Sequence, residues 1–189
     1  MTLKGKEILL GVTGGIAAFK AAALVSRLAA AGAGVSVMMT ESAAKLVAPQ
    51  TFYSLSGRPV RLSLWTDPQS AHPHIGAGKD ARIFCIVPAT ADIIAKAAAG
   101  IADDLVSTTI LAFDGPILLA PAMNSVMWSK PATRRNVARL EEDGFFFVGP
   151  EAGRLSCGDE GLGRMAEPEA IQEAIEKILA GSAPSKIRR

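Results

Sequence analysis

Short apolar segments alternate with longer alanine- and leucine-rich segments along almost the whole of this chain. The apolar segments are predicted strands at residues 7–12, 35–39, 83–87, 117–120 and 145–148. The segments between them are predicted helices at residues 16–33, 41–47, 49–56, 91–99, 103–112, 132–143 and 168–179. Strands that are apolar throughout are buried on both faces, and helices between consecutive strands are what a parallel sheet requires. The pattern therefore predicts one α/β domain, built as a three-layer α/β/α sandwich around a parallel sheet.

Three other segments are predicted to have less regular structure. Residues 59–65 are interpreted as a short strand near a sheet edge, and residues 66–80, which contain several breakers, as mostly loop. The Gly-rich segment 149–164 is predicted to be a long loop, and loops of that length often act as lids. The 189 residues fit one domain, which we assign to residues 1–180, with residues 181–189 as a basic tail expected to be disordered.

Composition excludes several classes of function. Although 49% of the residues are apolar, no uninterrupted apolar stretch approaches the roughly 18 residues of a membrane span, so no membrane partner is expected. The net charge is +2 and no basic stripe with interleaved aromatic residues occurs, which argues against nucleic acid. The first residues lack the apolar core of a signal peptide, and only two cysteines are present. We therefore expect a cytoplasmic protein with reduced thiols.

Small and hydroxyl-bearing residues follow several of the predicted strands. Gly14, Gly15 and Ile16 come after the first strand and open a helix, where backbone N–H groups and the helix N-terminus favour a phosphate. Thr40 and Thr90 follow two other strands, and Ser107 lies near a further helix start. Each glycine could serve only a tight turn, and each hydroxyl could serve only as a helix cap. Taken together, they line the carboxyl edge of one sheet, where a mononucleotide would bind.

The segment from Pro121 to Trp128 places an uncharged amide at the end of another buried strand. Asn124 can donate a hydrogen bond to a carboxylate and accept one from an amine without adding charge. Met123, Met127 and Trp128 surround it, and they are interpreted as packing residues, although they would also suit a dry pocket. The alternative for the whole segment is a strand followed by a capping loop.

The histidines and cysteines do not predict a metal site. Neither cysteine lies at the spacing from a second cysteine or a histidine that metal sites show, and His72 and His74 are the only histidines. His74 is a candidate general acid or base, with an exposed loop histidine as the alternative. Cys85 lies within a strand and is predicted to be a buried small hydrophobe. Cys157 lies in the Gly-rich segment between two arginines, where cations and exposure favour the reactive thiolate.

These motifs, in this order, resemble the homo-oligomeric flavin-containing cysteine decarboxylases. The matching elements cover roughly residues 6 to 179; they are residues 14–20, His74-Ile75, residues 88–91, Asp103-Asp104-Leu105, Pro121-Ala122-Met123-Asn124 with Met127-Trp128, Cys157-Gly158 and residues 163–168. The Pro-x-Met-Asn-x-x-Met-Trp motif is specific to the family, whereas the Gly loop is not. The Cys-Gly loop resembles the branch that acts on 4'-phosphopantothenoylcysteine in coenzyme A biosynthesis.

The resemblance implies a Rossmann-like or flavodoxin-like sheet, FMN bound across the strand ends, and a homotrimer or higher homo-oligomer with the flavin near the subunit interface. FMN would oxidise the substrate cysteine to a thioaldehyde, carbon dioxide would leave, and the ene-thiol would be reduced again. His74 matches the family's base, Asn124 the residue that holds the substrate carboxylate, with Met123 beside it, and Cys157 the thiol needed for the final reduction. The residues that match the cofactor site are Gly14, Gly15, Ile16, Thr40, Thr90, Ala91, Asp92, Ser107 and Ala122.

Two departures from the family pattern stand out. Asp92 occupies a position where asparagine is common, close to the expected flavin, and Phe19 replaces a frequent tyrosine. The chain also ends without the ligase half that is fused to many bacterial relatives, which is expected of a monofunctional protein or of a single domain of a longer one. Alternatives within the fold are a decarboxylase of peptidyl cysteine, a flavin prenyltransferase, or a non-catalytic regulatory subunit. The joint presence of His74, Asn124 and Cys157 argues against the regulatory subunit.

Overall fold

A single parallel sheet forms the centre of the protein. The computed structural model describes residues 3–65, 76, 78–155 and 158–181. The strands are β1 (Glu7–Val12), β2 (Gly34–Met39), β3 (Ile83–Ala89), β4 (Ile117–Pro121) and β5 (Phe146–Phe147). Their order across the sheet is β2-β1-β3-β4-β5, with every pair parallel. β1, β3 and β4 are buried almost throughout, as strands covered on both faces must be.

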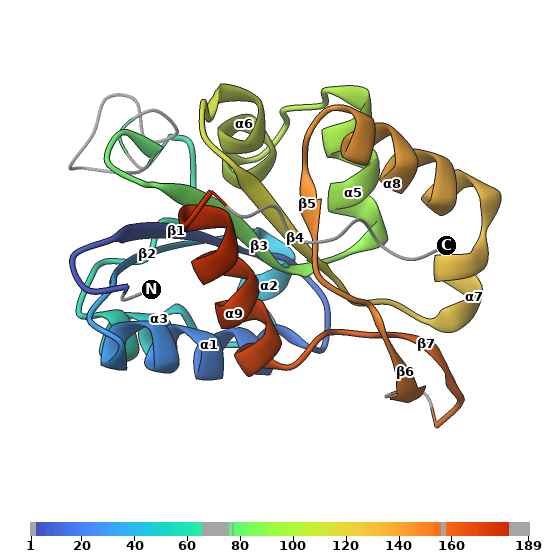
Figure 1. Ribbon diagram of the computed structural model, residues 1–189, viewed down its shortest axis with the longest axis horizontal. Coiled ribbons are helices and arrows are strands. Elements are labelled where there is room, and N and C mark those ends of the chain that lie inside the picture. Colours follow the sequence, from blue (N-terminus) through green and yellow to red (C-terminus); the bar gives the residue numbers. More distant parts are fainter. Residues whose placement is uncertain (1–2, 66–75, 77, 156–157, 182–189) are drawn as a thin grey trace.

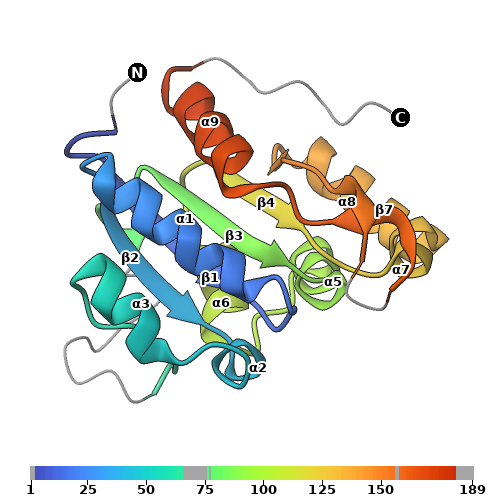
Figure 2. The same ribbon diagram turned by 90° about the horizontal axis from the view of Figure 1, so that it is seen from below.

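Helices cover both faces of this sheet, as Figures 1 and 2 show. One face carries α1 (Ala18–Ala30), α3 (Pro49–Ser56) and α9 (Pro168–Leu179), and the other carries α5 (Ala91–Ala99), α6 (Leu105–Ala112) and α8 (Pro131–Glu142). Two short helices, α2 (Glu41–Ala44) and α7 (Ser125–Ser129), follow β2 and β4. The predicted three-layer α/β/α sandwich is confirmed.

The sheet separates two hydrophobic cores, because alternate strand residues point to opposite faces. Ile8, Leu10 and Val12 of β1 pack toward α1, α3 and α9, whereas Leu9 between them packs toward α5, α6 and α8. Cys85 lies in the first of these cores and is fully buried, and burial raises the pKa of its thiol well above the usual range. Its predicted role as a small hydrophobe is confirmed. None of the helices in the described ranges is long and apolar enough to cross a bilayer.

Three predicted segments differ from the structure. The first helix begins at Ala18 rather than Ile16, because residues 13–17 form the turn after β1. The segment 59–65 contributes only an isolated parallel bridge, between Arg61 and Met38, instead of a strand. The predicted loop at 149–164 is wrong in part: it contains an antiparallel hairpin of β6 (Glu151–Arg154) and β7 (Glu160–Arg164). The predicted tail beyond Gly181 lies outside the described residues.

The hairpin was missed because it lacks the usual features of strands. Its strands contain Gly153, Gly161 and Gly163 and show no alternation of apolar and polar residues, whereas glycine is normally depleted in strands. What stabilises it is tertiary contact with α7 and the β4–α7 loop. Figure 1 shows the hairpin projecting from the body of the protein beside α7.

Candidate cofactor and substrate site

The residues predicted to bind a mononucleotide lie at one edge of the sheet. Neighbouring strands β2, β1, β3 and β4 end there in turn, and their carboxyl ends are followed by Thr40, Gly14, Thr90 and Asn124. In a parallel sheet this edge is where ligands bind. The topology therefore brings together side chains that are up to 110 residues apart in the sequence — Gly14 and Asn124.

The Gly loop after β1 is open to an anion. The amide of Gly15 donates to the carbonyl of Thr13 at 2.8 Å, whereas the amides of Gly14, Ile16 and Ala17 have no partner within the described part of the chain. A side chain at Gly14 would overlap Cβ of Ser42, so only glycine allows α2 to approach this closely. Unpaired amides at the start of a helix fit a phosphate group.

Thr13, which the sequence analysis did not single out, ties this loop to the end of β3. Its hydroxyl donates to the carbonyl of Pro88 at 2.7 Å and accepts from the amide of Thr90 at 3.3 Å. The side chain is 2% exposed, so these bonds are shielded from water. A hydroxyl directly after a strand and before two glycines was the signal that could have identified it. The contact fixes the loops that follow β1 and β3 relative to each other.

The predicted hydroxyl residues all cap helices. The Oγ1 atoms of Thr40 and Thr90 accept from the third amide after each, at 3.2 and 3.3 Å, and so begin α2 and α5. Ser107 is 2% exposed and belongs to the capping box of α6, where its amide donates to Asp104 at 2.8 Å. The hydroxyl of Ser107 contacts both Asp103 and Asp104. The two threonines thus lie at the open edge of the sheet, whereas the serine hydroxyl is committed to the helix cap.

Asp92, the residue that departs from the family pattern, faces a lysine. Lys96 Nζ lies 3.5 Å from a carboxylate oxygen of Asp92, 3.0 Å from Asp103 and 3.5 Å from Asp104, so one cation joins the start of α5 to the cap of α6. The hydrogen bond with Asp103 raises the pKa of Lys96, and the same contact lowers the pKa of Asp103. The negative charge that Asp92 brings to this edge is therefore partly balanced within the chain.

Asn124 begins α7 and takes part in its cap. Its Oδ1 accepts from the amide of Val126 at 2.8 Å, and its backbone carbonyl accepts from the amide of Trp128 at 3.0 Å. Trp128 is only 3% exposed, which confirms its predicted packing role, and Arg134 lies 4.8 Å from the centroid of its ring. Met127 is 47% exposed, so the prediction that it packs in the interior is wrong. It lies on the outer side of a short helix.

The residues beside Asn124 are held by neighbouring backbone. Ala122 donates from its amide to the carbonyl of Ala89 at 3.1 Å, which joins the ends of β4 and β3. Met123 donates from its amide to the carbonyl of Gly163 at 3.0 Å, which joins the loop to β7 of the hairpin. The Asn124 loop is thus held between the sheet and the hairpin.

The two predicted catalytic residues, His74 and Cys157, lie outside the described residues. The described arms of the hairpin bring Arg154 and Leu155 up to the segment that contains Cys157. Within the described ranges, no group of three or more His, Cys, Asp or Glu side chains is placed to hold a metal ion.

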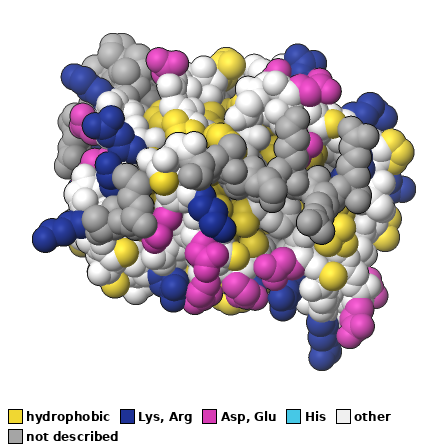
Figure 3. Space-filling model, in the orientation of Figure 1, with side chains coloured by type: hydrophobic (Ala, Val, Ile, Leu, Met, Phe, Trp, Pro, Cys, Tyr) yellow, Lys and Arg dark blue, Asp and Glu magenta, His cyan; other side chains and the backbone are white. Residues whose placement is uncertain are grey.

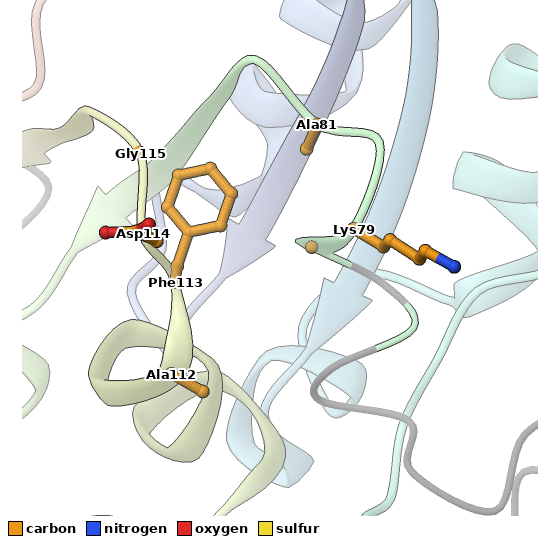
Figure 4. A pocket seen from close by; sticks show the side chains of 7 residues that line it. Lys79, Ala81, Ala112, Phe113, Asp114 and Gly115 are labelled. Carbon is orange, nitrogen blue, oxygen red and sulfur yellow. The ribbon is translucent and has the colours of Figure 1, made fainter.

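A separate hollow lies at the opposite edge of the sheet, ahead of the first residues of β3 and β4. It has a volume of about 270 Å³ and is lined by Gly78, Lys79, Ala81, Ala112, Phe113, Asp114 and Gly115. Figure 4 shows the Phe113 ring between its two walls, and that ring also packs edge-on against Phe84 with centroids 5.8 Å apart. This hollow shares no residue with the loops at the carboxyl ends of the strands.

With this geometry, the chain can be compared with known proteins. It matches the Flavoprotein family over residues 1–180, and it therefore belongs to that family. Among curated relatives, the Coenzyme A biosynthesis bifunctional protein CoaBC of Bacillus subtilis (strain 168) is 46% identical over 94% of this chain and 44% of the relative. The protein of the same name from Escherichia coli (strain K12) is 47% identical over 90% of this chain and 42% of the relative. The chain thus spans less than half the length of these relatives.

Solved structures agree in fold along nearly the whole chain. A mutant PPC decarboxylase complexed with pantothenoylaminoethenethiol matches with a TM-score of 0.82 and 30% identity, over 94% of this chain and 100% of that one. The FMN-dependent cysteine decarboxylase SpaF matches with a TM-score of 0.83 and 33% identity, over 96% of this chain and 99% of that one. The family resemblance inferred from the motifs is confirmed.

Proposed function

We propose that this chain catalyses the FMN-dependent decarboxylation of 4'-phosphopantothenoylcysteine to 4'-phosphopantetheine in coenzyme A biosynthesis. The strongest support for this proposal is the match along 94% of the chain to a mutant PPC decarboxylase complexed with pantothenoylaminoethenethiol. An ethenethiol is what remains when an oxidised cysteine loses its carboxylate. The extensive identity with CoaBC proteins supports the same substrate.

The residues at the strand ends fit FMN. We assign its phosphate to the amides of the Gly loop, with the threonines, the start of α5 and the β4–α7 loop around the remainder. The assigned residues are Gly14, Gly15, Ile16, Thr40, Thr90, Ala91, Asp92 and Ala122; Ser107 would act through the α6 cap. The amides of Gly14, Ile16 and Ala17, which have no partner among the described residues, support this assignment. FMN, when bound, supplies the oxidation of the substrate cysteine and later returns the same two electrons.

We assign substrate binding and the proton transfers to side chains near the substrate. Asn124 holds the substrate carboxylate next to Met123 by donating from its Nδ2, while its Oδ1 accepts the cap bond of α7. A neutral donor orients the carboxylate without stabilising its charge strongly, which leaves decarboxylation favourable. His74 accepts the proton of the substrate thiol, and Cys157 delivers a proton in the final reduction. Overall, one carbon dioxide is released, one proton is taken up, and no net oxidation occurs.

We also propose that the chain assembles as a homotrimer or a higher homo-oligomer, in the cytoplasm, with the site near a subunit interface. Large apolar side chains lie exposed beside the Gly loop and on α7: Ile16 is 60%, Phe19 61% and Val126 58% exposed. Apolar residues exposed next to a site favour burial against another subunit. Light scattering should give a mass of three times 19.6 kDa, or a multiple of it. A monomer that retains flavin would contradict the proposal.

The decisive experiment follows carbon dioxide and product mass after adding phosphopantothenoylcysteine to the yellow protein. We expect release of carbon dioxide and formation of 4'-phosphopantetheine. A Cys157→Ser variant should still release carbon dioxide but give a product two mass units lighter, because reduction of the ene-thiol fails. A normal product from that variant would remove the role of Cys157, and a yellow wild-type protein that releases no carbon dioxide would refute the enzyme.

The likeness to SpaF supports one alternative, a cysteine decarboxylase that acts on another cysteine-containing substrate. The same assay separates the two candidates if a peptide ending in cysteine is offered in parallel. Decarboxylation of the peptide in preference to phosphopantothenoylcysteine would favour the alternative.

A further inference from the structure

Four charged side chains from distant parts of the chain form a continuous line on one face of the protein. Lys20 of α1 binds Glu167, at the start of α9, with 2.8 Å between Nζ and Oε1. Arg164 of β7 lies 3.7 Å from the same oxygen of Glu167 and 2.9 Å from a carboxylate oxygen of Glu151 in β6. The line therefore joins α1 and α9 to both strands of the hairpin. Figure 3 shows acidic and basic side chains intermingled on this side of the molecule.

Lys20 is the shielded member of this line, because the side chains of Glu151, Arg164 and Glu167 are 35%, 41% and 43% exposed. The side chain of Lys20 is 17% exposed, and the Nε of Arg164 is buried without a hydrogen-bond partner among the described residues. Gly153 lies beside the guanidinium, because a Cβ there would be 3.4 Å from Nε. The hydrogen bond from Lys20 lowers the pKa of Glu167. The pair of Lys20 with Glu167 is therefore less weakened by salt than a pair with two exposed partners.

The residue before Arg164 touches the Asn124 loop. The carbonyl of Gly163 accepts from the amide of Met123 at 3.0 Å, and a side chain at position 163 would overlap the carbonyl oxygen of Met123. A side chain at Gly161 would lie 2.8 Å from Cβ of Ser125. β7 thus lies directly against the backbone on both sides of Asn124. A shift of β7 would move that loop with it.

We propose that Glu167 is a positioning residue for Asn124, acting through Arg164 and β7 to hold the 122–125 loop in the geometry that binds the substrate carboxylate. The inference rests on the proposed function for the role of Asn124, but the mechanical link from Glu167 to Met123 does not depend on it. Glu167 touches none of the proposed reacting groups.

The chain offers a matched control on the same helix. Glu169, two residues further on, also joins α9 to α1, because it lies 2.8 Å from Arg27. The side chains of Glu169 and Arg27 are 59% and 42% exposed, against 43% and 17% for Glu167 and Lys20, and Glu169 has no ion pair with the hairpin within the described residues. Glu167→Gln and Glu169→Gln each remove one negative charge from the N-terminal end of α9, at its N-cap and in its first turn respectively. Only the first change breaks the link to β7.

The first measurement is hydrogen exchange of the Met123 amide in the FMN-loaded protein. Glu167→Gln should speed this exchange roughly five- to tenfold, because loss of its ion pairs would allow local opening of the loop. Glu169→Gln should leave the exchange rate unchanged. Lys20→Met removes the other partner and should reproduce the effect. Equal exchange in wild type, Glu167→Gln and Lys20→Met would overturn the proposal.

The second measurement separates an effect on KM from a loss of active protein. Glu167→Gln should raise KM for phosphopantothenoylcysteine about tenfold at unchanged flavin content, because a misplaced carboxylate anchor weakens substrate binding. A variant that is only less stable would lose active protein at unchanged KM, and that result would refute the positioning role. If the wild type itself releases no carbon dioxide, the proposed function fails, and the exchange measurement still decides whether Glu167 holds the loop.

Discussion

Truncating Trp128 should destabilise the protein strongly and should also weaken the site. Its side chain is 3% exposed and belongs to the hydrophobic core on the face of the sheet covered by α5, α6 and α8, so Trp128→Ala should cost about 3–5 kcal/mol in free energy of unfolding. The contact with Arg134 contributes about 0.5–1 kcal/mol of this. A Trp128→Phe variant, which keeps most of the apolar area, should lose only about 1–2 kcal/mol.

The site is affected because α7 cannot hold its shape alone. The helix has five residues, far fewer than an isolated helix needs, so its packing through Trp128 keeps it in place. The Trp128 amide also donates to the carbonyl of Asn124 at 3.0 Å. We therefore expect Trp128→Phe, which should remain folded, to bind the substrate more weakly at unchanged flavin content.

Urea unfolding provides the assay, and the other tryptophan provides the control. Trp65 is 88% exposed, so Trp65→Ala should change the free energy of unfolding by no more than about 0.5 kcal/mol. The reasoning would be refuted if Trp128→Ala cost less than about 1 kcal/mol, or if the two truncations had the same effect.

Three further predictions concern charged and thiol groups. Because the pKa of Glu167 is lower in the folded protein, its ionised form contributes to stability above the unfolded value of 4.5, and this contribution is lost as pH falls through the folded pKa. Glu167→Gln should therefore reduce the fall in the urea midpoint on the acid side. An unchanged pH profile would contradict this. Lys96→Met should raise the pKa of Asp103 toward its ordinary value of 3.8, measured by NMR titration of the carboxyl carbon, and an unshifted titration would show that Lys96 does not set it. Cys85 should react with an alkylating reagent only after unfolding, as judged by mass spectrometry, because the thiol is buried and its pKa is raised; rapid labelling of the native protein would disprove its burial.

The sheet and its two helical layers could be predicted because their signals are local. The five strands are short apolar runs, and breakers such as Gly100 and the helix-starting Pro168 mark where helices end and begin. The carboxyl edge of the sheet then follows from topology, since every parallel strand delivers its next residue to that edge. Thr40, Thr90 and Asn124 were identified for this reason.

The remaining features depend on contacts between distant residues. Lys20 and Glu167 are 147 positions apart, and no local pattern links them. The hairpin has glycines where strands normally carry β-branched residues, and its conformation depends on α7 and on the pair of Arg164 with Glu151. Helix α7 was missed because five residues after a proline-containing strand end carry no measurable helical period.

The close approach of Gly163 to Met123 has a consequence for how this protein can be altered. Because the two backbones are in contact, a side chain at position 163 leaves no room for the Asn124 loop, and this limits any exchange of segments with a relative. An exchange of the hairpin alone succeeds only if the donor carries glycine at the position of Gly163. Substitutions intended to change substrate preference should therefore begin nearer the tip, at the paired residues Arg154 and Glu160, whose side chains are exposed.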